Sequence, residues 1–144
     1  RFVFVNNMEP ILYLVDTLKE SVSLVHLNVE LEPFTSQEIK YHKNSYRNII
    51  NNMRLTPYRP LFRKILTDQS VNIFLVRLKS DLNKTEDWRI DVFYSFGKYR
   101  FSALSPYLPE AIKYGSMYAS DTDINGERIL KKYTITNIEK LNKI

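Results

Sequence analysis

Residues 71–79, VNIFLVRLK, are followed by WRIDVFYS at 88–95 and YRFSAL at 99–104, and this stretch decides the fold. The first segment is apolar on both sides at its centre, which is typical of a strand inside a sheet. Between the other two segments, Gly97 can adopt a positive φ in a tight turn, so they are expected to pair as a hairpin. The stretch therefore predicts the centre of an antiparallel sheet.

The residues before this stretch predict two strands with a helix between them. Residues 1–6 form a short apolar run, and Asn7 can cap a helix that has Pro10 in its first turn and ends near residue 21. Residues 22–31 then alternate, with Val25, Leu27, Val29 and Leu31 on one face. This period of two predicts a strand that has one buried and one wet face.

Two further helices are expected between residues 35 and 66. The run Thr35-Ser36-Gln37-Glu38 matches a capping box, which predicts a helix from there to about Leu55. Pro57 and Pro60 break that helix, and residues 60–66 predict a second, shorter one.

Turn signals organise the end of the chain. Residues 105–115 predict a short helix that stops at Gly115, and Asn125-Gly126 predicts a two-residue hairpin turn before a strand over 128–138. The order of elements indicates an α+β fold, in which a long helix packs on a curved, mostly antiparallel sheet. This architecture resembles that of cystatin-like and nuclear-transport-factor-like domains, and the resemblance is an analogy of architecture that carries no function.

Composition limits the class of protein. At 144 residues the chain is expected to form a single domain over 1–144, and its start at Arg1 inside an apolar run indicates a fragment of a longer or processed chain. The absence of Cys excludes disulfides, thiolate metal sites and a Cys nucleophile. The sequence contains no run of about 18 apolar residues, the length that would predict a membrane span. An extracytoplasmic and a cytoplasmic location both remain open, as does the oligomeric state.

The most informative chemical feature is a basic segment. Residues 39–67 contain no Asp or Glu, yet they hold seven of the 21 Lys and Arg residues, whereas the rest of the chain holds more acidic than basic groups. The whole net charge of +5 therefore comes from this segment. The seven basic residues are Lys40, Lys43, Arg47, Arg54, Arg59, Arg63 and Lys64.

On the expected long helix, four of these residues share one face. At about 100° per residue, Lys40, Lys43, Arg47 and Arg54 fall within an arc of roughly 60°. These four residues form a basic stripe. Acids elsewhere in the fold could neutralise it, or it could simply be a solvated face of the helix. Alternatively it could bind an anionic partner, and Arg59 and Arg63 would extend it if the second helix packs alongside the first.

A second candidate site is an acidic turn. Asp121, Asp123 and Asn125 precede Gly126 in the order that begins a calcium-binding loop. The twelfth position of such a loop should be a bidentate Glu, but here it is Lys132. A hairpin turn is therefore the preferred interpretation, and a weak calcium site remains the alternative; no other metal ligation is expected.

Motifs of catalysis are missing from the sequence. It contains no phosphate-binding glycine loop, no nucleophile elbow and no zinc-protease motif, so we expect a protein that is not an enzyme and needs no cofactor. The favoured hypothesis is an interaction or assembly module whose basic helical face engages an anionic or protein partner. The alternative is a nucleic-acid-binding module that contacts phosphates through the basic segment at 40–64. Salt-dependent binding would separate the two.

Overall fold

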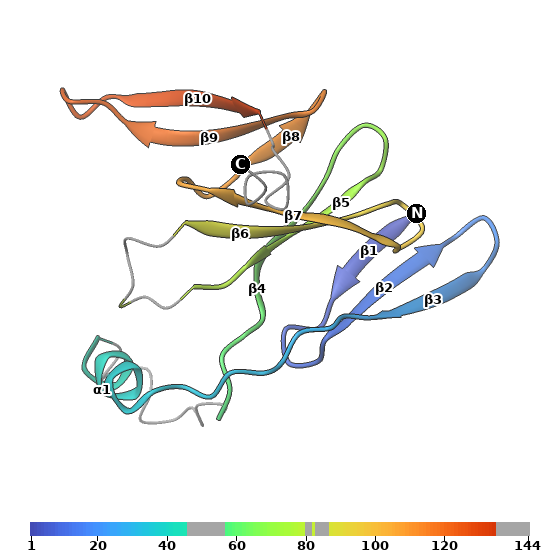
Figure 1. The fold of residues 1–144 in the computed structure, drawn as a ribbon, viewed down its shortest axis with the longest axis horizontal. Coiled ribbons are helices and arrows are strands. Elements are labelled where there is room, and N and C mark those ends of the chain that lie inside the picture. Colours follow the sequence, from blue (N-terminus) through green and yellow to red (C-terminus); the bar gives the residue numbers. More distant parts are fainter. Residues whose placement is uncertain (46–56, 80–81, 83–86, 135–144) are drawn as a thin grey trace, which may run out of the picture.

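The computed structural model describes residues 1–45, 57–79, 82 and 87–134. This part of the chain contains ten β-strands and one α-helix, and the strands form three antiparallel sheets (Figure 1). The protein is thus mostly β. The expected α+β class, with a long helix packed on a curved sheet, is wrong.

The N-terminal sheet has the order β1-β2-β3 and consists of β1 (Phe2–Val5), β2 (Ile11–Asp16) and β3 (Ser21–His26). The strand expected at the N-terminus is confirmed, but the helix expected from Asn7 to residue 21 is wrong. Its apolar run at 11–15 can serve either period, since successive residues are apolar. Burial decides for a strand, because Leu12 is completely buried while β2 pairs with a strand on each side.

The central sheet has the order β4-β5-β6-β7, formed by β4 (Phe62–Thr67), β5 (Ile73–Arg77), β6 (Trp88–Phe93) and β7 (Tyr99–Ser105). The central strand and the hairpin expected from the sequence are confirmed. Gly97 has φ +88°, and its amide donates to the carbonyl of Tyr94 over 2.8 Å.

The helix expected at 60–66 is wrong, because these residues form most of β4. A bulge between Phe62 and Lys64 shifts the register of β4 against β5, so Phe62 and Ile65 face one core. Leu66 faces the other core. The spacing i, i+3, i+4 imitates a helix, but the segment is a bulged strand covered on both sides.

The C-terminal sheet has the order β10-β9-β8, with β8 (Ala111–Lys113), β9 (Ser116–Thr122) and β10 (Arg128–Thr134). The helix expected at 105–115 is therefore wrong. Tyr114 and Gly115 both have positive φ, 50° and 70°, which is the geometry of a two-residue hairpin turn between β8 and β9. The last residues of the expected strand at 128–138 lie outside the described residues.

The three sheets are arranged as layers, with the central sheet between the other two (Figure 1). One face of the central sheet packs on the N-terminal sheet through Leu12, Leu75 and Phe93. The opposite face packs on the C-terminal sheet through Val76, Ile112 and Met117. Each face thus has its own hydrophobic cluster, which explains why β5 is apolar on both sides.

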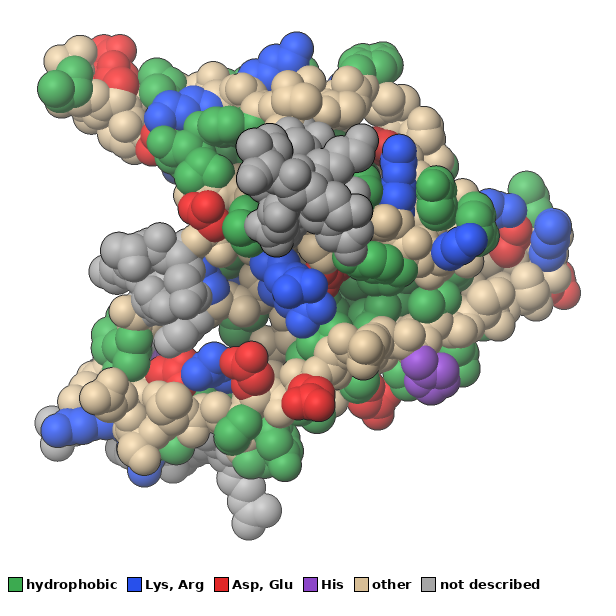
Figure 2. All heavy atoms as spheres, in the orientation of Figure 1, with side chains coloured by type: hydrophobic (Ala, Val, Ile, Leu, Met, Phe, Trp, Pro, Cys, Tyr) green, Lys and Arg blue, Asp and Glu red, His purple; other side chains and the backbone are tan. Residues whose placement is uncertain are grey.

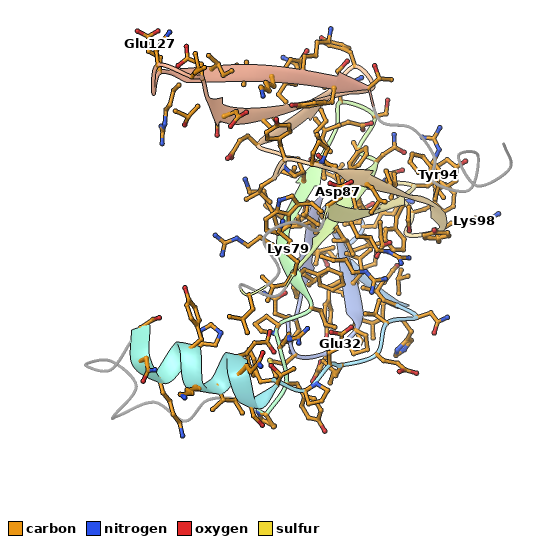
Figure 3. All side chains as sticks on the ribbon, turned by 60° about the vertical axis from the view of Figure 1, so that its left-hand side comes forward. Glu32, Lys79, Asp87, Tyr94, Lys98 and Glu127 are labelled. Carbon is orange, nitrogen blue, oxygen red and sulfur yellow. The ribbon has the colours of Figure 1, made fainter. Side chains whose placement is uncertain are left out.

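The helix α1 (Ser36–Ser45) lies apart from the three sheets, at the end of a connecting segment (Figures 1 and 3). Two extended pieces, 32–34 and 57–59, pair to form a neck that carries it, with a bridge between Pro33 and Tyr58. Figure 3 shows Glu32 on this neck. The expected capping box is confirmed, since the amide of Glu38 donates to Thr35 Oγ1 and the amide of Thr35 donates to Glu38 Oε2. The part of the expected helix from residue 46 to Leu55 lies outside the described residues.

Candidate functional site

The basic residues of the sequence hypothesis do not form one continuous surface in the described structure. Lys40 and Lys43 are exposed on α1, and Arg63 is exposed on β4 rather than on a second helix. Arg47 and Arg54 lie outside the described residues. The idea that a second helix extends the stripe is therefore wrong.

Two of the basic residues have acidic partners inside the fold. Arg59 contacts Glu32 at 2.7 Å and the buried Glu38 at 2.8 Å, which ties the neck to the first turn of α1. Lys64 contacts Glu110 at 2.7 Å, and this hydrogen bond together with the lysine's charge lowers the pKa of Glu110. Figure 2 shows red and blue side chains alternating near the beginning of α1. Part of the basic surplus is thus neutralised by acids from elsewhere in the sequence.

The residues of the calcium-loop pattern take part in the β9–β10 hairpin. The carboxylate of Asp123 accepts hydrogen bonds from the amides of Asn125 and Glu127, at 2.9 and 2.8 Å. Asp121 pairs with Lys131 of β10; this hydrogen bond lowers the pKa of Asp121 and raises that of Lys131. Among the residues that the structure describes, no group of three or more His, Asp or Glu side chains could hold a metal ion.

The turn itself differs from the two-residue form that Asn125-Gly126 suggested. β9 ends at Thr122 and β10 begins at Arg128, and the amide of Gly126 donates to the carbonyl of Asp123 over 3.1 Å. Gly126 has φ +83°. This is a turn closed by a glycine bulge, and the side-chain bonds of Asp123 favour it over the shorter form.

The most conspicuous surface of the described structure is the outer face of the N-terminal sheet, which we call the apolar face. The registers of the two strand pairs set Phe2 opposite Val15 and Val15 opposite Val22, with Phe4, Tyr13 and Leu24 in the next row. Ile11 and His26 form the third row. The apolar face therefore consists of Phe2, Phe4, Ile11, Tyr13, Val15, Val22, Leu24 and His26.

This face is exposed although it is apolar. Phe2, Phe4, Val22 and Leu24 expose 67%, 48%, 59% and 55% of their surface. The rings of Phe4 and Tyr13 stack with their centroids 4.6 Å apart, so the two aromatic side chains contact each other on this face. The eight residues of the face include no Lys, Arg, Asp or Glu, and Glu9 borders the face, with its carboxylate 3.4 Å from the Tyr13 hydroxyl. Contiguous apolar surfaces of this kind mark sites where a soluble protein contacts a partner.

The sequence contained a signal for this face that the expected wet face of the strand at 22–31 concealed. Val22 and Leu24 are apolar, although they lie opposite the set that was expected to be buried, which begins with Val25. In the structure Val25 and Leu27 do pack on the core. Val22 and Leu24 point the other way and stay in solvent. A strand with apolar side chains on both faces needs a packing partner on each face. Within the described structure, only the inner face of β3 packs on another sheet.

A second polar site lies on the central sheet, on the face that packs against the N-terminal sheet. The buried carboxylate of Asp91 accepts hydrogen bonds from Arg77 Nε, from Arg89 Nε at 3.1 Å, and from Ser102 Oγ. Tyr99 extends this network through its hydroxyl, 2.9 Å from Ser102 Oγ. None of these residues belongs to the basic segment or to the acidic turn.

No helix in the described residues has the length and apolar character needed to cross a membrane. Comparison with known proteins finds no matching family model, no matching curated protein and no matching solved structure. Function is therefore inferred from the chain's own residues and their geometry.

Proposed function

We propose that this chain is a non-enzymatic assembly module, and that its apolar face is covered by the apolar face of a second copy of the chain. The observation that carries the proposal is that four large apolar side chains are exposed together on one side of a single sheet: Phe2, Phe4, Val22 and Leu24. Leaving such a surface in water has a free-energy cost of about 25 cal/mol per Å² of apolar area, so covering it is favourable.

The area of the face suits a dimer of moderate affinity. Large apolar and aromatic side chains present about 150–250 Å² each when extended, so the eight partly exposed residues offer on the order of 600 Å² per copy. Two such faces together reach about 1,200 Å², the lower end of the range for specific interfaces. A two-fold dimer would thus be reversible rather than obligate.

Charge and shape favour a second copy over a charged partner. The apolar face contains no Lys or Arg, so it offers no basic side chain to the phosphates of nucleic acid or to an acidic peptide. Two sheets that pack face to face interdigitate their side chains at a separation of about 10 Å. A two-fold axis would set each copy's rows of apolar residues on those of the other.

The basic residues give less support to phosphate binding. Arg59 and Lys64 have carboxylate partners within the fold, and Arg63 lies on a strand of the central sheet. Lys40 and Lys43 remain exposed on α1 and keep the helix polar, in agreement with its position apart from the sheets.

The test is sedimentation velocity of the chain over a range of concentrations, with Leu24→Asp as the variant. Burying Leu contributes about 2 kcal/mol, so removing it should raise the dimer dissociation constant more than tenfold, with a further increase from the desolvated carboxylate. Leu130→Asp is the matched control, because Leu130 is 70% exposed on β10 of a different sheet. It should leave the dimer intact.

Added salt gives a second readout. Association through an uncharged face should persist as salt is raised, whereas association through the basic residues should weaken. A chain that stays monomeric at every concentration, or a Leu130→Asp variant that dissociates as readily as Leu24→Asp, would overturn the proposal. Circular dichroism of each variant establishes that the sheets are retained.

A further inference from the structure

The Asp91 network borders a cavity of about 450 Å³ between the central sheet and residues 25–29, which are the end of β3 and the three residues after it. This volume lies within the range that holds small organic ligands. The cavity is built from two sequence-distant parts of the chain, and Figure 1 shows the segment after β3 passing alongside the central sheet. Its lining contains a polar cluster and a group of apolar side chains next to it.

In the polar cluster, the carboxylate of Asp91 orients two guanidinium groups. Arg77 and Arg89 both use Nε to reach Asp91, whose side chain is only 4% exposed. Arg89 also donates from Nη2 to Ser102 over 3.2 Å. The terminal nitrogens of Arg77 donate no hydrogen bond within the described part of the chain. The pair therefore keeps donors available after the internal network is complete.

The formal charges of this polar cluster do not cancel. Two guanidinium groups face a single carboxylate, so the cluster carries a net charge of about +1 at neutral pH, and no other Asp or Glu lines the cavity. A guanidinium whose Nε is held can still present two parallel N–H groups to a planar anion. The side chain of Arg77 is 25% exposed, so such a contact would be partly shielded from water and from salt.

Apolar side chains line the cavity beside this cluster, with Phe62 opposite Arg77 and Leu75 opposite Asp91 in the strand registers. Leu27, Phe62, Leu75 and Phe93 belong to the same buried cluster, and each also borders the cavity. Hydrophobic walls with a few polar groups at one side are typical of sites for small ligands.

We propose that this cavity binds a small organic anion, whose carboxylate contacts Arg77 and Arg89 and whose apolar body lies against Phe62, Leu75 and Phe93. The ligand class follows from the polar cluster and the apolar walls together. An inorganic anion would leave the apolar walls without contact, and an uncharged apolar molecule would leave the arginine donors unused. Among the residues that line the cavity, only His26 also belongs to the apolar face, and it takes no part in the proposed contacts, so binding and self-association are tested at different residues.

The test is isothermal titration of the chain with 4-phenylbutyrate, and with the matched uncharged amide of the same acid. Charge-assisted hydrogen bonds contribute about 1.5–3 kcal/mol, so the amide should bind at least tenfold more weakly. The informative variant is Arg89→Gln, because Arg89 is 53% exposed and Asp91 keeps Arg77 and Ser102 as partners. It should weaken binding of the acid about tenfold and leave binding of the amide unchanged.

Two further variants keep the result interpretable. Arg63→Gln removes the same charge from an exposed position on β4 outside the cavity, and it should bind the acid as the natural chain does. Val29→Phe adds volume at the lining and should weaken binding of the acid and the amide alike. Each variant is first compared with the natural chain by thermal denaturation.

Three results would overturn the proposal: equal affinity for the acid and the amide, equal loss in Arg63→Gln and Arg89→Gln, or no saturable binding in the millimolar range. The sedimentation experiment on the apolar face does not depend on any of them. Failure of one proposal is therefore distinguishable from failure of the other.

Discussion

At the scale of single residues, Gly97 shows how the absence of one side chain allows two sheets to pack closely. It has φ +88° at the tip of the β6–β7 hairpin, and a Cβ added there would lie 2.4 Å from Val25 Cγ2 and 3.0 Å from Leu14 Cδ1. Both neighbours belong to the N-terminal sheet. The turn requires the glycine conformation, and the packing of the two sheets requires the missing side chain.

We therefore expect Gly97→Ala to lower the free energy of unfolding by about 3 kcal/mol, from left-handed backbone strain plus overpacking. Gly126→Ala is the matched control, since Gly126 has φ +83° but no atom within 4 Å of an added Cβ. It should cost about 1 kcal/mol, the backbone contribution alone. Urea unfolding measures both, and equal losses would show that contact with Val25 does not matter.

At the scale of elements, α1 depends on its cap more than a packed helix would. It has ten residues and lies apart from the sheets, and isolated helices shorter than about 12 residues are marginal in water. Thr35 and Glu38 cap it reciprocally, and Glu38 also accepts hydrogen bonds from Arg59 of the neck at 2.8 and 3.2 Å. The cap thus joins the helix to the rest of the protein.

Thr35→Ala should reduce the stability of α1 by about 1 kcal/mol without lowering the melting temperature of the sheets, because loss of an N-cap acts on the helix. Amide hydrogen exchange would report it as faster exchange at residues 39–45 with unchanged protection in β5 and β6. Ser36→Ala, next to the cap and exposed, is the control. Faster exchange throughout the central sheet would contradict the separation of α1 from the core.

The elements also show how far sequence patterns reach. The hairpin of β6 and β7 and the capping box were predictable, because each depends on neighbours within a few residues. The helix expected at 60–66 was not distinguishable from a bulged strand, since Phe62, Ile65 and Leu66 satisfy both patterns. The same ambiguity concealed β2. The apolar face was not predicted for that reason, because residues inside an expected helix are not assigned to the two sides of a sheet.

At the scale of the whole molecule, ion pairs connect layers that are far apart in the sequence. Lys64 of β4 reaches Glu110, just before β8, and so links the central sheet to the C-terminal sheet. The hydrogen bond and charge of Lys64 hold the pKa of Glu110 below its usual value of 4.5. A carboxyl whose pKa is lower in the folded than in the unfolded state stabilises the fold above the unfolded value. That contribution disappears as the pH falls through the folded value.

We expect the free energy of unfolding of the natural chain to fall more steeply below about pH 4.5 than that of Glu110→Gln, which lacks the titrating group. Urea unfolding at a series of pH values from neutral to acidic measures the difference. Glu127→Gln, at the tip of the β9–β10 hairpin, serves as the control for loss of one negative charge (Figure 3). Parallel profiles for the natural chain and Glu110→Gln would show that the Lys64 contact does not stabilise the fold.

By itself, the sequence determined the features that arise from near neighbours. These were the hairpin around Gly97, the cap at Thr35 and Glu38, and the concentration of positive charge between residues 39 and 67. The tertiary structure alone decided which apolar runs are strands, where Arg59 and Lys64 find acids, and which face of the N-terminal sheet is left uncovered. The physical reason is that a short apolar run suits a helix or a strand about equally. Only burial against, and pairing with, residues distant in the chain selects between them.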